Sequence, residues 1–278
     1  MYQLTDLLYL MQRLRNPDTG CPWDLKQDFA SILPHTLEEA YEVADAIERE
    51  DWPHLEEELG DLMFQVIFYG QLGEEAGHFS VASVIDKLVI KLVRRHPHVF
   101  PSGDLRAERS PDDTLDDAKI SANWNAIKEE EKRLANSDDV KKALLDDIPV
   151  TLPGLSRAVK LQKKASTVGF DWADAKAVMD KIEEELQEVR VELASGDMQR
   201  LESEIGDLLF AVTNLARLKK IDPEVAIRGT NTRFRRRFAH VERVVLECHG
   251  GFDNASLDQM EQAWQEAKRL EKQGLLPE

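Results

Sequence analysis

The sequence is poor in the residues on which several common kinds of protein depend. Only two cysteines, Cys21 and Cys248, occur among 278 residues, and neither has a CxxC partner. We therefore expect neither a disulfide framework nor a thiolate zinc site, and a reducing cytoplasm fits this composition best. No run of about 18 apolar residues occurs, so we expect no membrane-spanning helix. The first fifteen residues mix an acid and two arginines with apolar residues, which favours an amphipathic helix over a secretory signal.

Positive charge is also scarce. The chain has 36 lysines and arginines against 53 acids, which leaves a formal net charge of −17 at pH 7. This balance disfavours binding to nucleic acid or to an anionic membrane, and an anionic ligand would need basic side chains nearby. Hydrophobic residues make up 42% and charged residues 32%, which is typical of a soluble globular protein.

Signals for β-strands are few, whereas apolar residues recur at spacings of three and four along the whole chain. This pattern predicts an all-α fold. We expect helices over residues 36–50, from a cap at Asp51 to about residue 76, over 80–96 up to Pro97, and, more weakly, from about 112 to 135.

The chain also repeats itself. The segment LEEELGDLMF at 55–64 returns as LESEIGDLLF at 201–210 with seven identities in ten positions. The same offset of 146 places the acids of 38–42 on those of 184–188. We interpret this as a tandem duplication of one four-helix domain. The predicted domains are 1–135 and 157–278, joined by a linker over 136–156 that is rich in Pro, Gly and Asp.

Acids are dense at the repeated segments, with eleven in the thirty residues 35–64. On a helix Glu38, Glu39 and Glu42 share one stripe, and Glu58 and Asp61 form another. If two such helices pair antiparallel, their carboxylates meet. Like charges about 4 Å apart cost roughly 4 kcal/mol at an effective dielectric near 20, and a divalent cation reverses that cost. Oxygen ligands favour Mg²⁺, with Mn²⁺ as an alternative.

The neighbours of these acids bear on the choice between a metal site and a solvated helix face. Apolar residues on both sides of Asp61 and Asp207 predict that the helices are largely buried, so that the acids need a partner. Gly60 and Gly206 each cost about 1 kcal/mol against alanine inside a helix. Close approach of another helix would explain them.

Several motifs in a fixed order resemble a known family. Glu-Glu-x-x-Glu, a spacer and Glu-x-x-Asp occur together with GCPWD, RRHPHVF, VGFDW, EIGDLLF and TNTRFRRRF. Together they resemble the two-domain MazG proteins of the all-α nucleoside triphosphate pyrophosphohydrolases, over nearly the whole chain. The resemblance implies Mg²⁺-dependent cleavage of nucleoside triphosphates to the monophosphate and pyrophosphate, with little selectivity for the base.

The same resemblance implies roles for individual residues. The metal ligands would be Glu185, Glu188, Glu204 and Asp207 in the second copy and Glu39, Glu42, Glu58 and Asp61 in the first. Glu184 would contact substrate or water, and Glu184 and Glu185 are the catalytic candidates, although which acid serves as the base stays open. The substrate contacts would be Lys181, Glu184, Asn231, Arg233, Arg237 and Trp264, with Lys91, Arg95 and Trp124 in the first copy.

Both copies keep every acid, but they differ elsewhere. His35 and Val89 stand where the second copy has Lys181 and Asn231, so we expect catalysis in the second copy. We also expect a homodimer, because a duplicated four-helix unit often completes its core with another subunit. Two other readings stay open at this point. One is a non-catalytic helical scaffold with hydrated acids, and the other is a prenyl-type synthase suggested by DDTLDD at 112–117.

Overall fold

The computed structural model describes residues 1–110, 116, 120, 122–124, 126–128, 130, 131 and 143–276. Within these ranges the secondary structure is helical and contains no strand, which confirms the all-α prediction. The chain divides into an N-terminal unit, Met1–Asp138, and a C-terminal unit, Asp139–Glu278. Most of the acidic segment predicted as a helix over 112–135, and the start of the predicted linker, lie outside the described residues.

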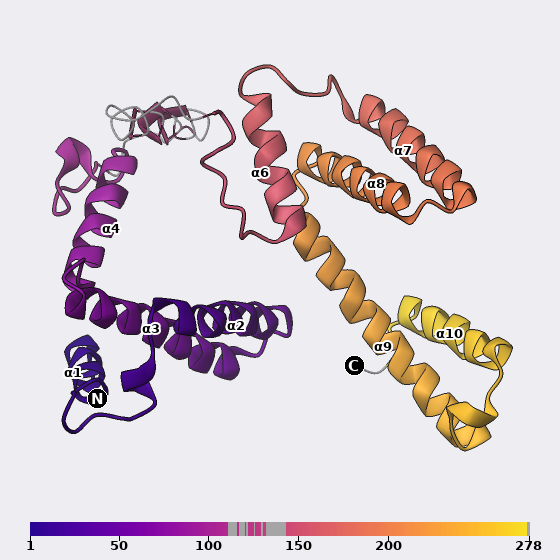
Figure 1. The fold of residues 1–278 in the computed structure, drawn as a ribbon, viewed down its shortest axis with the longest axis horizontal. Coiled ribbons are helices and arrows are strands. Elements are labelled where there is room, and N and C mark those ends of the chain that lie inside the picture. Colours follow the sequence, from indigo (N-terminus) through magenta and orange to yellow (C-terminus); the bar gives the residue numbers. More distant parts are fainter. Residues whose placement is uncertain are drawn as a thin grey trace. The chain divides into compact units, whose positions relative to one another are not determined.

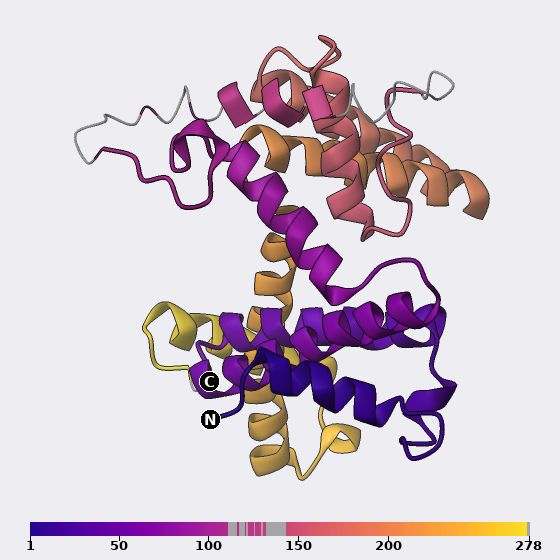
Figure 2. The same cartoon turned by 90° about the vertical axis from the view of Figure 1, so that its left-hand side faces the viewer.

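The N-terminal unit is built from α1 (Leu4–Leu14), α2 (Phe29–Glu48), α3 (Trp52–Glu75) and α4 (Val81–Arg95). α2 and α3 form an antiparallel hairpin, and α1 packs against α3 (Figure 2). Helix caps set these boundaries: the side chains of Asp28, Asp51 and Ser80 accept hydrogen bonds from the first free backbone N–H groups.

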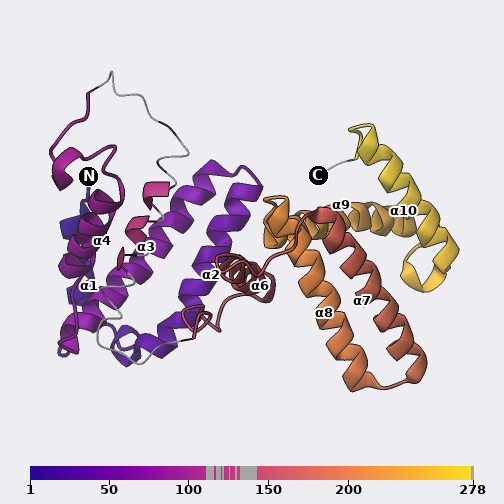
Figure 3. The same cartoon turned by 90° about the horizontal axis from the view of Figure 1, so that it is seen from above.

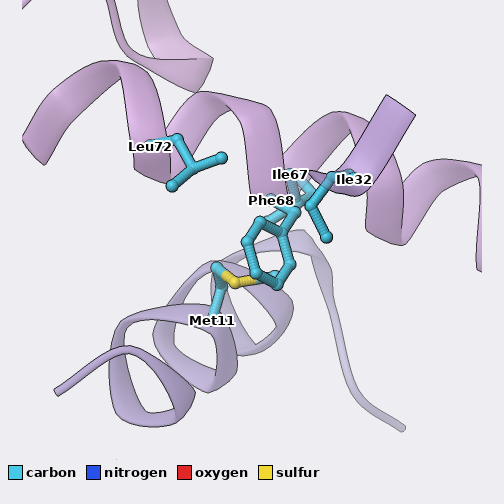
Figure 4. Packing of buried hydrophobic residues seen from close by; sticks show 5 residues of the cluster. All are labelled: Met11, Ile32, Ile67, Phe68 and Leu72. Carbon is cyan, nitrogen blue, oxygen red and sulfur yellow. The ribbon is translucent and has the colours of Figure 1, made fainter. Parts of the chain in front are cut away.

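The core of the N-terminal unit lies where α1, α2 and α3 meet. Met11 and Phe68 are fully buried there, together with Ile32, Ile67 and Leu72 (Figure 4). The guanidinium of Arg15 lies 5.3 Å from the Phe68 ring centroid and forms an ion pair with Glu75. α1 is therefore held to α3 by both apolar packing and a charged contact.

The C-terminal unit contains α6 (Gly154–Ser166), α7 (Ala175–Ser195), α8 (Met198–Leu218), α9 (Pro223–His249) and α10 (Leu257–Lys272). α7 and α8 lie side by side as an antiparallel hairpin (Figures 1 and 3), and α6 packs against α8 as α1 does against α3. α10 lies along the half of α9 that is far from α8 (Figure 1).

One carboxylate fastens the α9–α10 hairpin. Glu271 on α10 accepts hydrogen bonds from both Arg236 and Arg237 on α9. The Arg237 guanidinium also lies 5.7 Å from the Trp264 ring centroid. The N-terminal unit repeats this arrangement: Glu131 pairs with Arg94 and Arg95, and Arg95 lies 5.5 Å from Trp124.

The helix starts and ends agree with the sequence at most positions. Asp51 caps α3 as predicted, and α4 ends before Pro97. α2 was predicted to begin at residue 36 but begins at Phe29, with Pro34 inside it. Asp28 explains the difference, because its carboxylate accepts from the N–H groups of Ala30 and Ser31 and starts the helix two turns earlier. Among the described residues, none of the helices combines the length and apolar character needed to cross a bilayer.

Glu271→Gln tests the electrostatic clamp on the α9–α10 hairpin. Arg237 and Arg236 lower the pKa of Glu271, so its stabilising effect is full above the pKa of an unfolded glutamate and is lost as the pH falls through the lower folded-state pKa. The substitution should lower the thermal midpoint at pH 7, and the deficit should shrink below about pH 4. Glu261→Gln on the same helix removes only an exposed contact with Gln265 and should have little effect. Equal midpoints for the two variants at pH 7, or a deficit for Glu271→Gln that is unchanged in acid, would contradict this account.

Candidate metal centres

A cluster of three carboxylates lies between α7 and α8. Glu185 and Glu188 on α7 and Glu204 on α8 each offer one oxygen, and these oxygens all lie within 4.8 Å of one another. We call them the C-terminal carboxylate cluster. The antiparallel hairpin brings them together because Glu185 and Glu188 occupy one stripe of α7, next to Glu204 on α8.

The donor set and the burial of Glu185 fit a hard divalent cation. The Glu185 side chain is 7% exposed, and its Oε1 lies 2.8 Å from Lys181 Nζ. Its Oε2 is buried and has no hydrogen-bond partner in the described part of the chain. A buried carboxylate oxygen without a partner is costly, and a metal ion would satisfy it. With only oxygen ligands in the cluster, Mg²⁺ or Mn²⁺ fits better than a soft metal.

The cluster also perturbs the titration of its members. Burial raises the pKa of Glu188, and the close contact with the Glu185 carboxyl and its negative charge, together with the charge of Glu204, raise this pKa further. Lys181 opposes this effect. It contacts Glu184 Oε1 and Glu185 Oε1, each at 2.8 Å, and hydrogen bonds to these two acids raise the pKa of Lys181. The positively charged ammonium group of Lys181 therefore lies at the edge of the carboxylate cluster.

The N-terminal unit holds the equivalent N-terminal carboxylate cluster, formed by Glu39, Glu58 and Asp61. Burial and the charges of Asp61, Glu42 and Glu58 raise the pKa of Glu39. Burial, followed by the charge of Glu42, raises the pKa of Glu58. Glu42, which was predicted as a ligand, is thus close enough to act on both carboxyls although it is outside the cluster.

The two clusters differ in their basic neighbours. His54 Nε2 lies 3.2 Å from Glu58 Oε1, whereas the offset of 146 places Arg200 at this position of the second copy. His35 lies 3.6 Å from Glu38, while its counterpart Lys181 reaches two acids. The lysine is protonated, and therefore positively charged, throughout the pH range around neutrality, whereas a histidine is charged only in its protonated form.

The predicted burial of Asp61 and Asp207 is wrong for a single chain. Both residues are exposed, and Asp207 does not belong to the C-terminal carboxylate cluster. The buried acids of the two hairpins are instead Glu58 and Glu185. The reason is that only one face of each helix packs within its unit, so apolar neighbours in sequence lie partly on open faces. Gly60 and Gly206 likewise have no described residue within 4 Å of an added Cβ, so the described part of each unit does not make the expected close approach.

The other predicted substrate contacts lie on different helices. Arg237 and Trp264 belong to the α9–α10 hairpin, away from α7 (Figure 1), and Arg237 is already paired with Glu271. Arg95 is paired with Glu131 in the same way. The Trp264 and Phe234 ring centroids are 5.2 Å apart, and those of Trp124 and His96 are 4.9 Å apart, so both tryptophans already have packing contacts. The remaining predicted substrate contacts have exposed side chains: Lys91, Asn231 and Arg233.

A family model described as the MazG nucleotide pyrophosphohydrolase domain matches the chain twice, over residues 27–100 and 174–242. Together these ranges cover half of the sequence and contain both carboxylate clusters. The chain belongs to this family. The two matches also confirm the tandem MazG-like duplication.

Curated MazG relatives match along nearly the whole chain. A nucleoside triphosphate pyrophosphohydrolase of Escherichia coli K12 is 46% identical over 98% of this chain and 99% of its own length. A nucleoside triphosphate pyrophosphohydrolase/pyrophosphatase MazG of Thermotoga maritima is 38% identical over 95% of this chain and 94% of its own length. The likeness therefore extends over both units and is not confined to one domain.

The sequence did not reveal the two acids that form ion pairs with the arginines predicted to bind phosphate. Glu131 and Glu271 are 140 positions apart, as are Trp124 and Trp264. Extending the repeat comparison past the tryptophans would have aligned these two acids. Their pairing with the arginines depends on how the helices fold back, which no local pattern reveals.

Proposed function

We propose that this MazG protein cleaves nucleoside triphosphates between the α and β phosphates, with Mg²⁺ or Mn²⁺, at the C-terminal carboxylate cluster. The class of reaction is that of its family: the chain is a nucleoside triphosphate pyrophosphohydrolase. The observation that carries the site assignment is the buried Oε2 of Glu185, which has no hydrogen-bond partner and lies beside Glu188 and Glu204, because a bound cation would satisfy this oxygen and offset the repulsion.

The acids of α7 and α8 have separable roles in this proposal. Glu185, Glu188 and Glu204 would hold the metal, with Asp207, one helical turn after Glu204, completing the set. When bound there, a divalent cation would neutralise phosphate oxygens and lower the pKa of a water molecule. Glu184, which is exposed next to the cluster, would orient that water, and Glu184 or Glu185 would take its proton.

Lys181 is the basic residue best placed for the phosphates. Its Nζ lies at the edge of the cluster, where it would also contact a phosphate oxygen bound beside the carboxylates. Arg233 and Asn231 on α9 are exposed and stay predictions as further substrate contacts. Arg237 would have to exchange Glu271 for phosphate. Trp264 in this unit, and Lys91, Arg95 and Trp124 in the N-terminal unit, stay predictions as substrate contacts.

The geometry favours the C-terminal unit for catalysis. Lys181 supplies a permanent charge next to the carboxylates, whereas His35 contacts only Glu38 at 3.6 Å. The N-terminal carboxylate cluster keeps the ligands for a metal, with Glu39, Glu42, Glu58 and Asp61, and we propose that it binds the ion without efficient turnover.

The chemistry of the site disfavours the other two readings. A hydrated scaffold does not require a buried carboxylate oxygen without a partner. The segment that suggested a prenyl synthase falls outside the described residues except for Asp116, and the family match leaves no observation that favours that reading. A cytoplasmic protein with nucleotides as partners, and with neither nucleic acid nor membrane as a ligand, fits the charge of −17.

Two matched substitutions test the assignment of chemistry to the C-terminal unit. Glu185→Gln keeps the size of the side chain but removes the negative ligand, so it should lower the rate of pyrophosphate release from ATP and Mg²⁺ by at least about 100-fold. Glu39→Gln makes the same change in the first copy and should retain most of the activity. The products should be AMP and pyrophosphate by phosphorus NMR. Orthophosphate as the product, or loss of activity only in Glu39→Gln, would refute the proposal.

We also propose that the protein is a homodimer in which a second copy covers the open faces of α3 and α8. Leu59, Met63 and Val66 on α3 are about half exposed, and Leu209 and Val212 on α8 are too. Contiguous apolar faces of this kind on a single chain are typical of an interface. The space beside Gly60 and Gly206 would let the partner helix approach closely.

Light scattering should therefore give the mass of two chains. A buried aspartate opposes association, so Leu209→Asp should shift the mass towards one chain. Gln199→Asp, near the capped start of the same helix, should leave the mass unchanged. A wild-type mass of one chain at micromolar concentration would rule out the dimer.

A further inference from the structure

A cavity of about 500 Å³ lies in the C-terminal unit beside the helix that carries Glu204. It is formed by α6, α8 and the loop that contains the VGFDW motif, to which neither the metal site nor the proposed mechanism assigns a role. Its aromatic walls are Phe170, Trp172 and Phe210, and its polar lining includes Gln162 and Asn214. This size and this mixture of aromatic and polar groups are typical of a small-molecule site.

Local geometry holds the loop over the cavity. Gly169 follows α6 with φ of +85°, a conformation that favours glycine, and turns the chain so that Phe170 to Trp172 line the cavity. Asp171 then forms an ion pair with Arg217 on α8. This ion pair holds the loop against α8, which forms the opposite side of the cavity.

The two amides in the lining have fixed orientations. Gln162 Nε2 donates to the backbone oxygen of Phe210 at 2.8 Å, so the other atom of this amide must be its oxygen. Arg217 Nε donates to Asn214 Oδ1 at 2.8 Å, so the other atom there must be the NH₂ group. Both residues are more than nine-tenths buried.

These contacts leave one acceptor and one donor without partners. Gln162 Oε1 is buried and accepts no hydrogen bond from the described residues. Asn214 Nδ2 likewise donates to no described residue. A ligand with an adjacent donor and acceptor on a flat ring would satisfy both amides while its faces met the aromatic walls. Nucleobases have this combination of a planar ring and an edge with donors and acceptors.

The N-terminal unit shows what the same position looks like when it is filled. The offset of 146 aligns Asn214 with Phe68, which is fully buried against Met11 of α1 (Figure 4). α1 packs on α3 there as α6 packs on α8. The first copy therefore has an apolar core where the second has a hollow with two amides. Packing alone gives no reason to exchange a buried Phe for a buried Asn, because the amide costs more to bury.

The cavity also lies at a suitable distance from the metal site. Phe210 follows Asp207 by three residues and Asn214 follows Glu204 by ten, which corresponds to about 5 Å and about 15 Å along α8. An extended nucleotide with its phosphates at the acids can follow the same helix towards the cavity. We infer that this cavity receives the base of the nucleoside triphosphate, an inference that rests on the proposed function. Trp264, packed on Phe234 and Arg237, then has a structural role or contacts another part of the substrate.

Asn214→Phe, which installs the residue of the first copy, tests this assignment. The bulkier ring should fill the cavity and raise the Kd for the uncleavable α,β-methylene analogues of ATP and CTP at least tenfold. The affinity for Mg²⁺-tripolyphosphate, which has phosphates and no base, should change less than twofold. Pyrophosphate release should lose kcat/KM mainly through KM. Phe68→Leu is the matched control in the first copy and should lower stability without changing nucleotide affinity.

Tryptophan fluorescence locates the base without relying on a core substitution. The analogues should quench the emission of the wild type, and the quenching should disappear in Trp172→Phe and survive in Trp264→Phe. Quenching that is lost only in Trp264→Phe, an unchanged Kd in Asn214→Phe, or no nucleotide binding by the wild type would each overturn the inference. If the wild type binds the analogues in an Asn214-dependent manner but releases no pyrophosphate from ATP, the base site stands and the proposed hydrolysis fails.

Discussion

Repulsion among carboxylates is the constraint on which the rest of this structure depends. Each unit contains a helical hairpin that brings three acidic side chains to within 4.8 Å of one another, with one of them almost completely buried. The raised pKa values of Glu39, Glu58 and Glu188 reflect the cost of this arrangement, to which burial contributes most. A divalent cation bound in each hairpin, as we propose, would offset this cost in both units. The surrounding helices keep the acids in position through caps and core packing at a distance from the site.

The two units are duplicated copies of one helical domain, and they share some features and differ in others. The shared parts are the acidic hairpin and the Arg-Arg-Glu-Trp arrangement that fastens the last two helices, seen at Arg95 and Trp124 and again at Arg237 and Trp264. The parts that differ are those that would contact a substrate. Lys181 replaces a histidine at the edge of the acids, and Asn214 replaces the phenylalanine that fills the first core. We interpret the N-terminal unit as the more structural copy and the C-terminal unit as the one adapted to bind a nucleotide.

Local signals in the sequence were enough to predict much of the fold. The cap at Asp51, the stop at Pro97 and the repeat of 146 residues gave the helical hairpins and the all-α class, and the spacing of acids three and four apart gave the clusters. Errors arose where the outcome depended on which face of a helix packs. Asp61 and Asp207 have apolar neighbours in sequence but are exposed, while Glu58 and Glu185 are buried. The pairing of Arg237 with Glu271 and the cavity beside Gln162 are tertiary features, since they join residues 34 and 48 positions apart.

Titration with Mn²⁺, followed by calorimetry, tests the central claim that the acidic hairpins exist to bind a divalent ion. The wild type should take up one ion in each unit, Glu185→Gln should lose one of the two sites, Glu39→Gln should lose the other, and the double variant should bind neither. Uptake that is undetectable in the wild type with and without nucleotide, or that is unchanged in the double variant, would show that these carboxylates are not metal ligands and would contradict the account.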